Sequence, residues 1–90
     1  MADVVVGGDF FEISSSNKNW TCCDLADGFL VLIKDDVDED YLIEKLEESQ
    51  FTDIEHNTMF KSKRNKAYCF RFKMEKNREV ELQEWLDKFN

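Results

Sequence analysis

The sequence predicts one small α+β domain, in which an antiparallel sheet of four or five strands carries two amphipathic helices on one face. Three observations support this class. The chain has 90 residues and is 42% hydrophobic, which is enough for one core and too short for a second. The predicted elements follow the order strands, helix, two strands, helix. Each predicted helix has a single apolar stripe, and one face of a sheet is the simplest surface that buries both.

The first half of the chain contains three predicted strands. Residues 10–13 form a short apolar strand, and the polar segment 14–19 after them is expected to be a loop. Strand 20–25 is joined to strand 28–34 by a hairpin turn at Asp27 and Gly28. The second of these strands is continuously apolar before Lys34, which is typical of a central, well-buried strand.

The first helix is predicted from about Asp38 to Ser49. Acidic residues fill its first turn, as the positive end of the helix dipole favours, and Asp36 or Asp38 is the expected N-cap. The inward-facing residues are expected to be Tyr41, Leu42, Ile43 and Leu46.

The second helix is predicted from Asn77, as its N-cap, to Phe89. Its apolar residues recur at i, i+3, i+4 and i+7, which places them on one stripe. These residues are Leu82, Trp85, Leu86 and Phe89.

Between the helices, segments 51–61 and 67–74 are predicted to form a second hairpin across residues 62–66. Successive side chains of a strand point to opposite faces, so Tyr68, Phe70 and Phe72 share one face. We expect this aromatic face to be covered by the helices, which leaves Arg71 and Lys73 on the open face. The predicted core is Phe29, Val31, Ile33, Leu42, Leu46, Ile54, Phe60, Tyr68, Phe70, Phe72, Leu82, Trp85, Leu86 and Phe89, with Trp20 either in the core or at an interface.

The charge is unevenly distributed along the chain. Twelve basic and twenty acidic residues leave a net charge of −8, which excludes the whole surface as a nucleic-acid footprint. Segment 61–78 contains eight basic residues and one acid, so it carries +7. The remainder contains four basic and nineteen acidic residues, so it carries −15.

The expected location is the cytoplasm. The first residues have neither a basic start nor an apolar run of signal-peptide length, and no segment reaches the roughly 20 apolar residues of a membrane span. Three cysteines, Cys22, Cys23 and Cys69, form an odd and sparse set that fits reduced thiols.

The primary hypothesis is a non-catalytic protein-binding module that presents carboxylates to a basic site. Acids spaced along one helix face imitate a phosphate backbone and associate fast with basic clefts. In size and charge the chain resembles small acidic proteins that block nucleic-acid enzymes, including phage-encoded inhibitors and nuclease immunity proteins. The expected partner is therefore a protein with a basic surface, and the binding residues are Asp36, Asp38, Glu39, Asp40, Glu44, Glu47 and Glu48.

The alternative hypothesis is a nucleic-acid-binding domain. The basic residues of segment 61–73 flank an aromatic strand, and segment 66–72 resembles the aromatic octapeptide of RNA-recognition motifs. Two features depart from that family: no strand follows Phe89, and the aromatic parity favours core packing. The candidate residues are Lys61, Lys63, Arg64, Lys66, Arg71 and Lys73. A homodimer that pairs the acidic helix with the basic hairpin of its twin is a third alternative.

No enzyme activity, cofactor or metal site is expected. The chain has one histidine, His56, and no catalytic or phosphate-loop motif. Asp36, Asp38 and Asp40 alternate as in a calcium-binding EF-hand loop, but Tyr41 stands where that loop needs glycine. The three cysteines lack the paired spacing of a zinc site.

Overall fold

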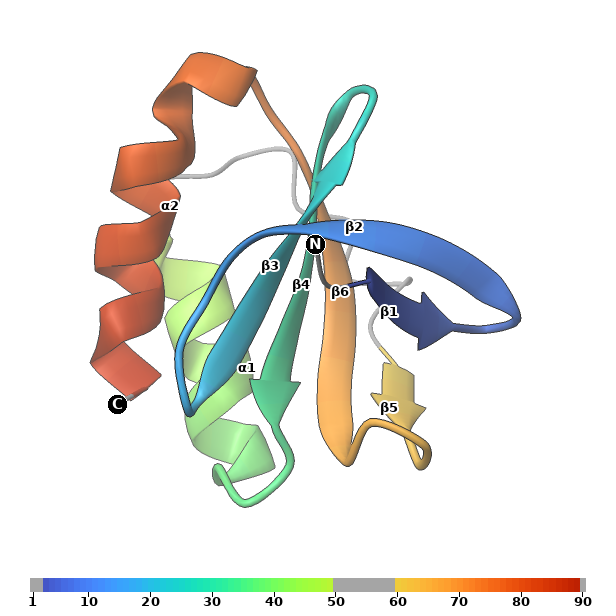
Figure 1. Ribbon diagram of the computed structural model, residues 1–90. Coiled ribbons are helices and arrows are strands. Elements are labelled where there is room, and N and C mark those ends of the chain that lie inside the picture. The colour runs from blue at the N-terminus through green and yellow to red at the C-terminus, as the bar shows by residue number, and fades with distance from the viewer. Residues whose placement is uncertain (1–2, 50–59, 90) are drawn as a thin grey trace.

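The computed structural model describes residues 3–49 and 60–89, which form one antiparallel sheet and two helices (Figure 1). The sheet has six strands in the order β1-β2-β3-β4-β6-β5, so the prediction of four or five strands was too low. The strands are β1 (Asp3–Val6), β2 (Asp9–Ser16), β3 (Trp20–Leu25), β4 (Gly28–Lys34), β5 (Phe60–Ser62) and β6 (Ala67–Lys73), and the helices are α1 (Glu39–Glu48) and α2 (Glu79–Leu86).

The N-terminal hairpin of β1 and β2 was not predicted. Gly7 and Gly8 connect its strands with φ angles of +59° and +86°. Positive φ at both central residues is the signature of a type I′ turn, whose twist matches that of the strands it joins. Strand β2 also continues to Ser16, so the prediction of a loop over 14–19 was wrong at its start.

The predicted hairpin of β3 and β4 is confirmed. Leu25 pairs with Gly28, which makes the connection a two-residue turn and places Gly28 already in the strand. Strand β4 pairs with β3 on one side and β6 on the other, and all of its residues except Lys34 are buried. The continuous apolar run was thus a correct signal of a central strand.

The helix-covered face of the sheet contains the main core, as predicted. Eleven of the predicted core residues lie in this cluster, Phe89 packs against it half-buried, and Trp20 belongs to it at 7% exposure. Phe70, Phe72 and Trp85 make edge-to-face aromatic contacts, with ring centroids 5.1–6.4 Å apart. Ile54 and the side chain of Phe60 lie outside the described part of the structure.

A second, smaller core lies on the opposite face, which was expected to be open. The sheet curls, so that the β1–β2 ribbon crosses the face away from the helices (Figure 1). The buried residues there are Val6, Cys23, Leu30, Leu32, Ala67 and Cys69. Asn65, in the β5–β6 turn, donates from Nδ2 to the Val5 carbonyl oxygen at 2.9 Å, which ties β1 to the opposite end of the sheet.

Helix α1 agrees with its prediction almost to the residue. Asp38 is the N-cap, and its Oδ1 accepts from the Asp40 backbone N–H at 3.2 Å. Leu42 and Leu46 are buried, whereas Tyr41 is 37% exposed, with the Phe89 ring edge-on to it and the Lys45 ammonium 5.3 Å from its ring centroid. Tyr41 was therefore wrongly assigned to the inward face.

The second predicted helix is divided into three pieces. A 3₁₀ turn, Lys76–Arg78, precedes α2, and another, Asp87–Phe89, follows it. Asn77 thus lies inside the first turn and is not the N-cap. The buried stripe of Leu82, Trp85 and Leu86 is as predicted. Of the predicted strand 51–61, residues 51–59 lie outside the described part.

Candidate protein-binding surface

Four carboxylates share one face of α1. Glu44 lies four residues after Asp40, three before Glu47 and four before Glu48, and residues so spaced are surface neighbours on a helix, with about 5–6 Å between their Cβ atoms. All four side chains are exposed, and the buried leucines of α1 point to the sheet. We call Asp40, Glu44, Glu47 and Glu48 the acidic face.

The other three predicted acids, Asp36, Asp38 and Glu39, are exposed at the start of α1 but serve different purposes. Asp38 caps the helix, so its carboxylate is already engaged. Asp36 and Glu39 precede the acidic face along the chain and do not belong to its row. Sequence periodicity therefore located the correct helix, and the structure reduces the contiguous row to four of the seven residues.

The acidic face is nearly unpaired. Glu48 Oε2 lies 3.1 Å from Lys45 Nζ, and this hydrogen bond raises the pKa of the Lys45 ammonium. Among the described residues, no other member of the face is in an ion pair. Like charges at this spacing destabilise a helix, so the mutual repulsion within the row costs stability.

The basic residues do not form one surface. Lys61 pairs with Tyr68 and its ammonium lies 5.6 Å from the centroid of that ring, on the helix-covered face. Arg71 and Lys73 lie on the opposite face, toward the far end of β6. Lys63, Arg64 and Lys66 occupy the β5–β6 turn, and all six residues are exposed.

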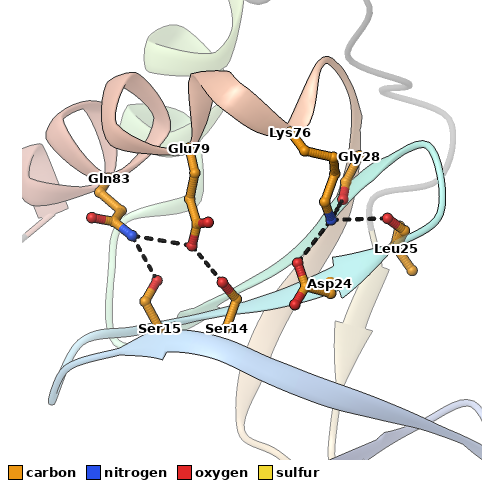
Figure 2. Close-up of polar contacts among 8 residues, drawn as sticks. All are labelled: Ser14, Ser15, Asp24, Leu25, Gly28, Lys76, Glu79 and Gln83. Atoms are coloured by element: carbon orange, nitrogen blue, oxygen red, sulfur yellow. Dashed lines mark hydrogen bonds and ion pairs between the residues drawn. The ribbon is translucent and has the colours of Figure 1, made fainter.

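Two polar clusters hold α2 against the sheet (Figure 2). A β-bulge between Ile13 and Ser15 breaks the side-chain alternation of β2, so that Ser15 shares the face of Cys22 and points to α2. Gln83 Nε2 donates to Ser15 Oγ at 3.0 Å, and Ser14 Oγ donates to Glu79 Oε2. Sequence analysis missed this cluster because a bulge has no signal in the serine run.

The second cluster centres on Lys76. Its ammonium donates to Asp24 Oδ1 at 2.7 Å, to the Leu25 carbonyl at 2.9 Å and to the Gly28 carbonyl at 2.8 Å (Figure 2). It also lies 4.1 Å from the centroid of the Phe29 ring. All three N–H donors of the ammonium are used, and these hydrogen bonds hold the 3₁₀ turn that precedes α2 against the β3–β4 turn.

A polar groove of about 510 Å³ lies between the end of α1 and α2. Trp85 lines it together with both acidic and basic side chains. The lining residues are Lys45, Glu48, Ser49, Glu81, Glu84, Trp85 and Lys88. The groove adjoins the acidic face through Glu48.

The cysteines are buried and chemically quiet. Burial raises the pKa of Cys22 to about 12 and the pKa values of Cys23 and Cys69 to about 11, so few thiolates form near neutral pH. His56, the single histidine, lies outside the described residues. Within residues 3–49 and 60–89, no three histidine, cysteine or acidic side chains are grouped to hold a metal ion.

In the same described ranges, neither helix has the length and apolar character that crossing a membrane requires. Comparisons with known proteins found no matching family model, no similar curated protein and no similar solved structure.

Proposed function

We propose that this chain is a non-catalytic, stoichiometric protein-binding module of the inhibitor or immunity type. It docks the acidic face of α1 on a basic site of a nucleic-acid-handling protein, where the carboxylates occupy the positions of backbone phosphates. The observation that carries the proposal is the exposed row of Asp40, Glu44, Glu47 and Glu48, of which only Glu48 has an ion-pair partner within the described structure.

The row has the dimensions for this role. A ten-residue helix is about 15 Å long, and the Cβ atoms of residues at its i, i+3 and i+4 positions stand about 5–6 Å apart. Helix α1 is also a firm support, because Leu42 and Leu46 anchor it in the core and Asp38 caps its first turn. Because the backbone that carries the row is already fixed, binding costs little backbone conformational entropy, which favours tight association.

The nucleic-acid alternative is less well supported by the geometry. Two of its six residues, Arg71 and Lys73, lie on the opposite face of β6 and toward its far end from the other four, so the six do not form one continuous surface. The aromatic side chains that would stack on bases, Tyr68, Phe70 and Phe72, are buried under the helices.

The test is affinity capture from host lysate, with and without nuclease treatment, with three tagged proteins. These are the wild type, the variant Glu44→Lys/Glu47→Lys, and the control Glu12→Lys/Glu75→Lys, which makes the same charge change at exposed sites elsewhere. We expect a basic nucleic-acid-handling protein with the wild type and the control, released by duplex DNA as competitor, and its loss with the α1 variant. Capture that the α1 variant retains contradicts the proposal, and capture that nuclease abolishes supports the alternative.

A further inference from the structure

A second charged surface lies at the end of the sheet where α1 begins. Backbone hydrogen bonds bring its parts together, because Asp35 N–H donates to the Lys66 carbonyl at 2.9 Å and Lys34 pairs with Ala67. The turn residues between β5 and β6 therefore lie beside the loop that enters α1 (Figure 1). We call the exposed cations Lys34, Lys61, Lys63, Arg64 and Lys66 the basic end.

The turn that carries most of the basic end is held in one conformation. Ser62 Oγ accepts from the Asn65 backbone N–H at 3.2 Å and from Asn65 Nδ2 at 3.0 Å, and the same amide reaches the Val5 carbonyl. Lys66 has a φ of +52°, a left-handed conformation that favours glycine. The turn therefore presents its cations from a backbone that three hydrogen bonds hold in place.

None of the five cations is in an ion pair within the described residues. The chain itself has a complementary surface, the acidic face of α1, which is also almost unpaired. Among the described residues, no ion pair joins the acidic face to the basic end of the same molecule, although Asp35 and Asp36 stand close to the basic end. Charge complementarity therefore favours a second copy of this chain as the occupant.

We propose that two copies associate reciprocally, with the acidic face of each on the basic end of the other. A contact between two different patches closes into a dimer when a two-fold axis repeats it, and otherwise it propagates into open chains. α1 starts at the basic end, and a closed dimer requires both patches of one copy to meet the same neighbour. This inference goes beyond the proposed function and stands without it, but the dimer covers the acidic face, so self-association and partner binding exclude each other.

The net charge of −8 opposes association over long distances, and the contacts act only at close range. Since the Debye length is about 8 Å at 0.15 M salt and about 30 Å at 0.01 M, moderate salt screens the repulsion more than it weakens the contacts. We therefore expect the strongest dimerisation near about 0.1–0.15 M salt, with dissociation constants of about 10 µM to 1 mM, as for small polar interfaces.

The experiment is sedimentation equilibrium of the full chain with charge-reversal variants. Lys63→Glu/Arg64→Glu reverses the basic end, and Glu44→Lys/Glu47→Lys reverses the acidic face. Each variant alone is expected to dimerise at least about tenfold more weakly than the wild type, since several exposed ion pairs become repulsive. An equimolar mixture of the two variants is expected to recover the dimer, because both contacts are complementary again.

The matched control for the turn variant is Arg71→Glu/Lys73→Glu, which makes the same charge change on the same hairpin outside the basic end. It is expected to change dimerisation far less than the turn variant. A wild type that stays monomeric to about 1 mM at every salt concentration, where weak complexes form, overturns the proposal. So does a dimer that survives both reversals, or a mixture that fails to restore it. If the wild type captures a partner that the α1 variant loses, but the wild type is monomeric, only this inference is refuted. If the wild type dimerises and the variant mixture restores the dimer, but no partner is captured, only the proposed function is refuted.

Discussion

Replacement of Lys76 by methionine tests how the start of α2 is held. Methionine keeps the length and the contact with the Phe29 ring, but it removes the charge and the three hydrogen bonds to Asp24, Leu25 and Gly28. The Lys76 and Asp24 side chains are 44% and 46% exposed, so water replaces part of what is lost. We therefore take about 0.5–1 kcal/mol for each bond, and expect a loss of about 2 kcal/mol in the free energy of unfolding.

For a domain of this size, 1 kcal/mol corresponds to a change of about 4–8 °C in the unfolding temperature, so the expected decrease is about 8–16 °C. The assay is thermal and urea unfolding followed by circular dichroism, with Lys88→Met as the control, because Lys88 is exposed and has no hydrogen bond or ion pair within the described residues. If the two variants differ by less than about 0.5 kcal/mol, which is the scatter of ordinary surface substitutions, water fully replaces the three bonds and the reasoning fails.

A second variant separates the ion pair from the carbonyl contacts. Asp24→Asn removes the carboxylate charge and leaves both backbone carbonyls bonded to Lys76. Exposed ion pairs contribute about 0–1 kcal/mol, so this variant should cost less than half as much as Lys76→Met. An equal cost would assign the stabilisation to the ion pair alone.

Three further predictions follow from single positions. In Gly28→Ala, the added Cβ would stand 1.8 Å from the Phe72 carbonyl oxygen, so we expect the free energy of unfolding to fall by about 4 kcal/mol or more. For Gly8→Ala, where φ is +86° and the space is open, we expect a decrease of about 1 kcal/mol. Equal decreases for the two variants in urea unfolding would contradict this. Burial raises the pKa of Cys22 from 9.0 to about 12 in the folded state. Above pH 9 the unfolded chain loses the thiol proton while the folded chain keeps it, so the contribution of Cys22 to the free energy of unfolding is complete below pH 9 and is lost as the pH rises toward 12. Stability over this range should therefore fall more steeply in the wild type than in Cys22→Ala, and parallel curves would refute the assignment. Glu44→Lys turns three repulsive helix neighbours into attractive ones and should stabilise the domain by about 0.5–1 kcal/mol at low salt, measured by thermal melting; a lower stability would show that Glu44 is engaged within the fold.

The sequence was sufficient wherever local chemistry decides the structure. The 3.6-residue period located both helices, and Asp38, one of the two expected N-caps of the first helix, is the residue that caps it. The expected cap of the second helix, Asn77, was wrong. The continuous apolar run marked β4 as central, and strand parity correctly placed Phe70 and Phe72 under the helices. A further local signal was present and overlooked: Gly7-Gly8 between apolar segments is a type I′ hairpin turn.

Other features depend on contacts between distant segments, which leave no periodic trace. The bulge that turns Ser15 toward α2 is one extra residue in an unremarkable serine run, and the three acceptors of Lys76 come from a turn about fifty positions earlier. The second core follows from sheet curvature, and the grouping of Lys34 with the β5–β6 turn follows from the pairing of β4 with β6.

By itself, therefore, the sequence determined the class of the fold, the helices, the main core and which helix presents carboxylates, because each depends on the periodicity of neighbouring residues. Only the tertiary structure decided which charges form a common surface. It reduced seven candidate acids to a row of four, split six candidate cations into separate groups, and placed the start of α1 beside the β5–β6 turn. The physical reason is that charges act through space over several ångströms, and the distances between strands are set by pairing and curl rather than by order along the chain.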